Sequence, residues 1–142
     1  MNFGIVSDSS CDLPESYVQT EQVEIVSFYL SFDGEEYYRE GKEISIPEFY
    51  QRMAENPDCF PKTSMPSIQD YVGAFLSFVK KGLPVLCICL SRKLSGSLQA
   101  AVNAKGGGRA VSGGKDRSRG FLSCDSSSGN ACKKRGRNEK CG

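Results

Sequence analysis

One stretch near the centre of the chain restricts the possible folds more than any other. Residues 85–90 form a continuous apolar run, which is typical of a strand buried on both faces of a parallel sheet. A polar turn, Ser91–Ser97, follows it, and the Ala-rich run Leu98–Lys105 favours a helix. A strand, a turn and a helix in this order predict an α/β fold, with an open, mostly parallel sheet and helices on both faces.

The turn between that strand and that helix is a candidate ligand site. In open parallel sheets, ligands bind beyond the carboxyl ends of the strands. The free N–H groups in the first turn of a helix, together with the positive end of its dipole, attract anions. The hydroxyls of Ser91, Ser95 and Ser97 surround this turn in the sequence. We therefore expect a site for a small anion or a carboxylate.

The charged residues divide the chain of 142 residues into two unlike segments. Residues 1–105 contain 9 Lys or Arg and 14 Asp or Glu, a net charge of −5, whereas residues 106–142 contain 9 and 3, a net charge of +6. The second segment also holds 9 of the 15 glycines. Its few large apolar side chains cannot offset a backbone entropy of about 1–2 kcal/mol per residue. We predict an α/β domain over residues 1–105 and a disordered tail over residues 106–142.

Strand and helix patterns alternate through the first segment. Strands are expected at three places, Phe3–Ser7, Val23–Val26 and Phe28–Phe32. The pair Asp33-Gly34 predicts a tight turn into a returning strand, Glu35–Tyr38. Helices are expected near Pro14, with Ser10 or Asp12 as the cap, and after the two capping patterns Ser45–Glu48 and Ser67–Asp70. Pro57 and Gly82 end the last two of these helices.

The seven cysteines are interpreted as thiols of a cytoplasmic protein. The chain begins without the basic and apolar regions of a signal peptide, and no apolar stretch approaches the ~20 residues of a membrane span. Cys87 and Cys89 alternate with apolar residues in the central strand, so we expect them to be small core residues. The cysteine spacing and the lack of histidine argue against a metal site, and no cofactor is expected.

Nucleic acid is not an expected partner. The basic run Lys133–Arg137 could contact phosphates, but no aromatic side chains or helical pattern accompany it. We interpret this run as part of a solvated tail.

Four motifs, in the same order along the chain, resemble the DegV family of bacterial lipid-binding proteins: Ile5–Pro14, Phe32–Glu35 with Tyr38 and Gly41, Pro61–Ser67, and Leu90–Ser97. The resemblance implies a two-domain α/β fold with a long-chain fatty acid between the domains. It also implies that hydroxyls of the Lys-Thr-Ser and Leu-Ser-Gly loops hold the carboxylate. In this sequence Thr63 and Ser95 are then the first candidates and Ser64 the second, with Ser9 and Ser10 as weaker candidates.

The resemblance further implies a non-catalytic role. Some family members are carriers that present the bound acid to a separate fatty acid kinase, which makes an acyl phosphate. A long-chain fatty acid and a fatty acid kinase are therefore the expected partners, and no enzymatic activity is expected.

The resemblance ends at Lys105. Two positions within the motifs also differ from the usual family pattern, with Met65 in place of Gln and Ser97 in place of Thr. The second half of family members supplies another wall of the lipid tunnel, with Arg and His groups near the carboxylate, whereas this chain contains no His. We hypothesise a truncated or frame-shifted member in which fatty-acid binding is impaired.

Two other function classes stay open at this stage. The seryl turn around Ser95 could belong to a serine-nucleophile hydrolase, but the chain has neither a His base nor a Gly-x-Ser-x-Gly motif. A phosphate- or nucleotide-binding α/β domain is the other alternative. Neither of the common Gly-rich phosphate motifs follows a strand, and Gly106–Gly108 follows the last helix instead of preceding it.

Overall fold

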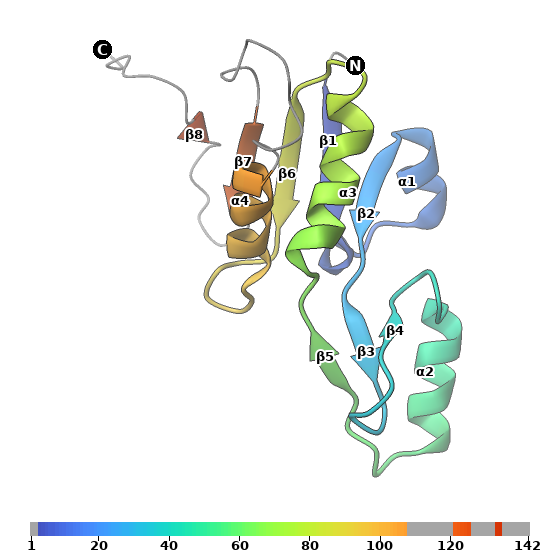
Figure 1. Cartoon of the computed structure of the whole chain (residues 1–142). Helices are drawn as coiled ribbons and strands as arrows, with labels where there is room; N and C mark the ends of the chain where they lie inside the picture. The colour runs from blue at the N-terminus through green and yellow to red at the C-terminus, as the bar shows by residue number, and fades with distance from the viewer. Residues whose placement is uncertain (1–2, 108–120, 126–132, 135–142) are drawn as a thin grey trace.

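The computed structural model describes residues 3–107, 121–125 and 133–134. Within these ranges the strands form one large and one small sheet, arranged as an upper and a lower part in Figure 1. The predicted open and mostly parallel α/β fold is confirmed.

The large sheet has the strand order β2-β1-β6-β7-β8. Its members are β1 (Gly4–Asp8), β2 (Val23–Val26), β6 (Val85–Cys89), β7 (Phe121–Asp125) and β8 (Lys133–Lys134). The neighbours β2, β1, β6 and β7 pair in parallel, and only the β7–β8 pair is antiparallel. Strands β7 and β8 lie within residues 106–142, the segment that was expected to be a disordered tail. Most other residues of that segment lie outside the described ranges, so the tail and its boundary at Lys105 stay predictions.

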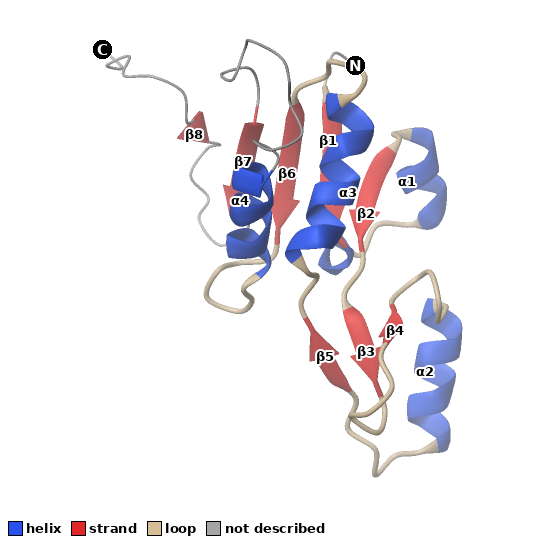
Figure 2. Ribbon diagram, in the orientation of Figure 1, coloured by secondary structure: helices blue, strands red, loops and turns tan. Residues whose placement is uncertain are grey.

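Helices cover both faces of the large sheet, as predicted. Helix α3 (Ile68–Val79) and helix α4 (Ser97–Gly107) lie side by side over one face (Figures 1 and 2). Helix α1 (Glu15–Thr20) connects β1 to β2 and packs near β2. This connection runs along the sheet in the direction opposite to those of α3 and α4, which lead to β6 and β7. Since crossover connections are right-handed, α1 belongs to the other face.

The main core lies between the large sheet and the pair α3–α4. Val6 and Cys87 of neighbouring strands are fully buried there, and Tyr71 and Phe75 of α3 pack on them. Three alanines form the matching side of α4, namely Ala100, Ala101 and Ala104. The prediction that Cys87 and Cys89 are core residues is confirmed, since their exposed fractions are 0% and 2%.

The small sheet is antiparallel and has the order β4-β3-β5. It consists of β3 (Tyr29–Ser31), β4 (Tyr38–Arg39) and β5 (Lys62–Ser64), with α2 (Ile46–Glu55) beside it (Figure 1). The sequence predicted no strand at Lys62–Ser64, and the returning strand was expected at Glu35–Tyr38. The observed return begins later because Asp33 Oδ1 accepts hydrogen bonds from the N–H groups of Glu35 and Glu36. Those two amides are therefore occupied in a turn.

The helix starts differ in how well the sequence predicted them. Ser45 and Ser67 cap α2 and α3 as expected, and Ser67 with Asp70 forms the complete capping box. Before α1 the expected cap by Ser10 or Asp12 is wrong. The N-cap position is Pro14, Asp12 has a left-handed backbone with φ of 50°, and residues Ser9–Cys11 form one short 3₁₀ turn.

Candidate functional site

The strand order places a topological switch point between β1 and β6. The chain leaves β1 towards β2 on one side and leaves β6 towards β7 on the other. In doubly wound sheets the connections diverge at such a point and leave a crevice beyond the carboxyl ends of the two strands. The seryl turn after β6 and the segment Ser9–Asp12 after β1 both begin at this place.

Asp8 connects the two strand ends. Its carboxylate is 1% exposed, and Oδ2 accepts a hydrogen bond from the backbone N–H of Leu90 at 2.7 Å. Oδ1 accepts a second bond from the hydroxyl of Ser10 at 2.5 Å. Leu90 is the residue directly before the seryl turn. Asp8 thus fixes the point from which that turn starts.

The seryl turn is ordered by its own hydroxyls. Ser91 and Ser97 are buried, whereas Ser95 between them is half-buried. The hydroxyls of Ser95 and Ser97 are 2.8 Å apart, and Ser95 Oγ also accepts a bond from the N–H of Ser97 at 3.2 Å. Because Ser97 is the first residue of α4, Ser95 lies at the positive end of that helix.

Thr63 and Ser64 lie in β5 of the small sheet. Both residues are exposed, and they pair with Leu30 and Tyr29 of β3. Within the described ranges neither hydroxyl has a hydrogen-bond partner in the protein. Both groups are therefore free to donate a hydrogen bond to a ligand.

A contact between Met65 and Gly96 joins the two predicted halves of the site. A methyl group at Gly96 would lie 2.5 Å from the sulfur of Met65, so that side chain packs directly on the glycine. Met65 follows Ser64, and Gly96 follows Ser95. The segments that carry the three principal candidates are thus in contact, although they come from different sheets. Their assignment as carboxylate ligands stays a prediction.

The weaker candidates Ser9 and Ser10 both have partners within the protein. Ser9 Oγ donates to Glu40 Oε2 at 2.5 Å and accepts from the N–H of Phe28 at 2.9 Å. Ser10 Oγ donates to Asp8. A ligand would have to displace these bonds, so the geometry favours a structural role for both hydroxyls.

Asp8 is the residue whose role the sequence did not reveal. The available signal was its position at the carboxyl end of β1, but pairing with Leu90, 82 positions away, depends on the sheet order. No group of three or more metal-ligating side chains exists in the part of the chain that the structure describes.

A protein-family sequence model described as "Uncharacterised protein, DegV family" matches residues 2–117. This match covers most of the chain and extends past Lys105. The chain belongs to the DegV family. Among curated DegV relatives, a DegV domain-containing protein of Clostridium acetobutylicum is 32% identical over 101 residues. That alignment covers 71% of this chain and 36% of the relative, so the chain spans little more than a third of that relative's length.

Solved DegV structures have the same fold. A stearic-acid-binding protein from Eubacterium ventriosum is 42% identical, with a TM-score of 0.79 over 87% of this chain and 41% of its own. A fatty-acid-binding DegV family protein from Thermus thermophilus is 29% identical, with a TM-score of 0.67 over 88% of this chain and 41% of its own. In the described residues of this DegV member, no helix has the length and apolar character needed to cross a membrane.

Proposed function

We propose that this chain binds a long-chain fatty acid through its carboxylate, with Thr63 and Ser95 as the principal donors and Ser64 as a further donor. The observation that carries the proposal is the packing of Met65 on Gly96, which brings the two hydroxyl-bearing segments into contact. The solved relatives described as fatty-acid-binding proteins support it.

The hydroxyls and the acyl chain contribute differently to the free energy of binding. A hydrogen bond to a charged group contributes about 1.5–3 kcal/mol, and a helix N-terminus adds about 0.3–1 kcal/mol. Each buried CH₂ group contributes about 0.8 kcal/mol, so a long acyl chain supplies most of the affinity. The hydroxyls then set the orientation of the ligand.

The surroundings of the hydroxyls predict modest affinity for residues 1–142 alone. Two apolar side chains beside the site are open to solvent in the described structure, with exposed fractions of 77% for Leu94 and 48% for Met65. Methylene groups of a ligand would stay partly wet against such a surface. Binding of palmitate by this chain with micromolar affinity would contradict this expectation.

A non-catalytic role fits the hydroxyl geometry better than a hydrolase does. A serine nucleophile needs a base within hydrogen-bond reach. The partner of Ser95 Oγ is the hydroxyl of Ser97, which is no base, and the chain contains no His. Covalent labelling of Ser95 by a fluorophosphonate probe would instead support the hydrolase.

The proposal extends to a carrier role. A protein that binds a fatty acid without transforming it can deliver the ligand to another protein. The resemblance to carriers that serve a fatty acid kinase suggests such a kinase as the acceptor, and co-purification with a candidate kinase tests that step.

The binding site itself is tested by NMR titration of the ¹⁵N-labelled chain with octanoate and, separately, with octanol. Octanoate is soluble enough to reveal weak binding, and octanol has the same alkyl chain without the charge. We expect octanoate to shift the amide signals of Thr63, Ser64 and Ser95, and octanol to leave them nearly unchanged. Equal shifts with both ligands, or octanoate shifts confined to other residues, would contradict the proposal.

A further inference from the structure

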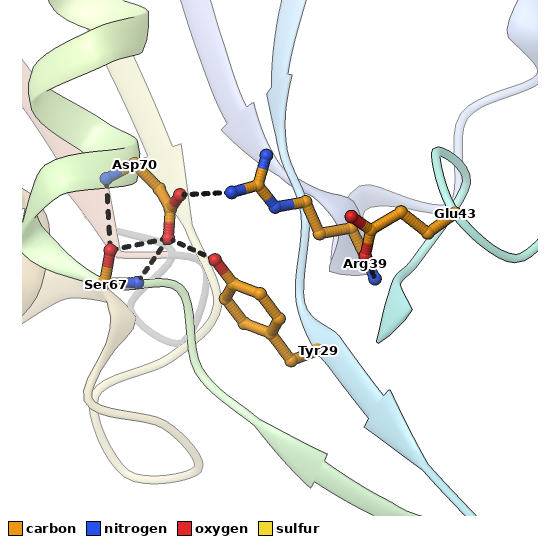
Figure 3. Close-up of polar contacts among 5 residues, drawn as sticks. All are labelled: Tyr29, Arg39, Glu43, Ser67 and Asp70. Atoms are coloured by element: carbon orange, nitrogen blue, oxygen red, sulfur yellow. Dashed lines mark hydrogen bonds and ion pairs between the residues drawn. The ribbon is translucent and has the colours of Figure 1, made fainter. Parts of the chain in front are cut away.

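The carboxylate of Asp70 does more than cap helix α3. Oδ2 accepts a hydrogen bond from the N–H of Ser67 at 2.8 Å, and this bond forms the capping box together with the bond from the Asp70 N–H to Ser67 Oγ (Figure 3). Oδ2 also accepts a bond from the hydroxyl of Ser67 at 2.6 Å. The same oxygen accepts a third bond from the hydroxyl of Tyr29 at 3.0 Å. Oδ1 faces the guanidinium of Arg39 at 3.8 Å. The last two contacts are not needed for capping.

These contacts connect the two sheets. Tyr29 lies in β3 and Arg39 in β4 of the small sheet, whereas Asp70 lies in a helix packed on the large sheet. Figure 3 shows the side chains of Tyr29 and Arg39 both pointing at the first turn of α3. The guanidinium of Arg39 also lies 5.9 Å from the centre of the Tyr29 ring, and its backbone N–H donates to Glu43. We call Asp70, Tyr29 and Arg39 the clasp.

The clasp continues directly into the candidate site. Tyr29 is the register partner of Ser64, and the next residue of β3, Leu30, pairs with Thr63. The residue whose side chain bonds to Asp70 is therefore joined by its backbone to the strand that carries the candidate hydroxyls.

The other side of the clasp leads to Ser95. Helix α3 packs on helix α4 through Tyr71, Ala74 and Phe75 against the alanines of α4. Ser95 lies two residues before the first residue of α4, Ser97, and its hydroxyl is bonded to that residue. One continuous path thus runs from Ser95 through α4 and α3 to Asp70, and from there through Tyr29 to Ser64.

We infer that Asp70 is a positioning residue, which acts through Tyr29 and Arg39 to set the place of Thr63 and Ser64 relative to Ser95. This inference rests on the proposed function. Within it, the clasp acts chiefly on recognition of the carboxylate, because the strand that Tyr29 pairs with, β5, carries the hydroxyls of Thr63 and Ser64.

The variant Tyr29→Phe isolates this role. It removes one hydroxyl from the clasp and leaves the Ser67–Asp70 capping box intact. A matched control is Tyr38→Phe in β4 of the same sheet, where the hydroxyl bonds to Glu36 and has no contact with Asp70. Asp70→Asn provides a second test, since it weakens both the clasp and the cap.

The experiment measures dissociation constants for octanoate and octanol by NMR titration, together with amide hydrogen exchange, in the whole chain and the three variants. We expect Tyr29→Phe to raise the dissociation constant for octanoate about three- to tenfold and to leave that for octanol unchanged. Exchange of the β5 amides should become faster in Tyr29→Phe and stay as in the unmodified chain in Tyr38→Phe.

Two results would overturn the inference. One is an unchanged ratio of the octanoate and octanol dissociation constants in Tyr29→Phe. That ratio stays the same if neither affinity changes, or if both affinities fall equally because the variant is generally destabilised. The other is unchanged exchange of the β5 amides in Tyr29→Phe and Asp70→Asn. If the unmodified chain gives no response to octanoate, the proposed function fails, and the exchange data still decide whether the clasp holds β5.

Discussion

The carboxylate of Asp8 and the backbone N–H of Leu90 are hydrogen-bonded at 2.7 Å across the carboxyl ends of β1 and β6. These strands flank the switch point of the large sheet, so the bond joins the two strand ends at that point. It also sets where the seryl turn leaves β6. The position of Ser95 therefore depends on a residue near the start of the chain.

Asp8→Ala should destabilise the fold by about 1–3 kcal/mol, because it leaves the N–H of Leu90 without its acceptor in a partly buried place. Asp8→Asn should cost less, since its amide oxygen can still accept that bond. Urea denaturation measures both values. Asp58→Ala at an exposed position is the control and should be nearly neutral. Equal midpoints for Asp8→Ala and Asp58→Ala would show that the bond contributes nothing to stability.

Gly4→Ala and Gly73→Ala should have opposite effects. A methyl group at Gly4 would lie 2.3 Å from two ring atoms of Phe78, so we expect a loss of about 1–3 kcal/mol from overpacking. A methyl group at Gly73 in α3 meets no atom within 4 Å, and alanine there should stabilise the helix by about 0.5–1 kcal/mol. Thermal unfolding of both variants checks this. The packing of Phe78 on β1 is disproved if Gly4→Ala is as stable as the unmodified chain.

Cys87 should resist alkylation in the folded protein. Its interaction with the neighbouring Cys89 thiol, at a sulfur–sulfur distance of 3.6 Å, and its burial raise the pKa of Cys87 far above the ordinary value. The reactive thiolate is therefore scarce, and the side chain is also inaccessible. We expect iodoacetamide at about pH 8 to label the half-buried Cys11 before Cys87. Peptide mapping reports the order, and unfolding in urea should make both thiols reactive. Labelling of Cys87 as fast as that of Cys11 in the native state would refute this prediction.

The clasp should lose its contribution to stability in acid. Burial raises the pKa of Asp70, but hydrogen bonds from Ser67 and Tyr29 and the charge of Arg39 outweigh it and lower that pKa. A lowered pKa stabilises the fold fully above the unfolded value, about 3.9, and the contribution disappears as the pH falls through the folded value. Urea midpoints of the unmodified chain and Asp70→Asn should therefore converge below about pH 4. A constant difference across that range would exclude a role for the Asp70 charge.

Local patterns in the sequence were sufficient to predict most of the large sheet. The apolar run at residues 85–90 and the capping box at Ser67 each depend on neighbours within a few residues, and the structure confirms both. Strand β5 escaped prediction because Lys62, Thr63 and Ser64 are all exposed and carry no apolar alternation. Only its pairing with β3, more than thirty residues earlier, makes it a strand.

The candidate site was predictable as two separate segments and not as one arrangement. The motifs identified Thr63 and Ser95 as candidate carboxylate ligands, but no sequence pattern indicated that Met65 would pack on Gly96. The roles of Asp8 and Tyr29 were hidden for the same reason, since their decisive partners, Leu90 and Asp70, are remote in the sequence. Contacts of this kind depend on the strand order, which local periodicity does not encode.

The most direct test is a double-mutant cycle on octanoate binding with Thr63→Ala, Ser95→Ala and the double variant, with octanol as the uncharged reference. Each single change should weaken octanoate by about tenfold, the two losses should not be additive because both hydroxyls bind one carboxylate, and octanol binding should not change. If both single variants bind octanoate as well as the unmodified chain does, these hydroxyls do not recognise a carboxylate. The same conclusion follows if their affinity for octanol falls as much as their affinity for octanoate.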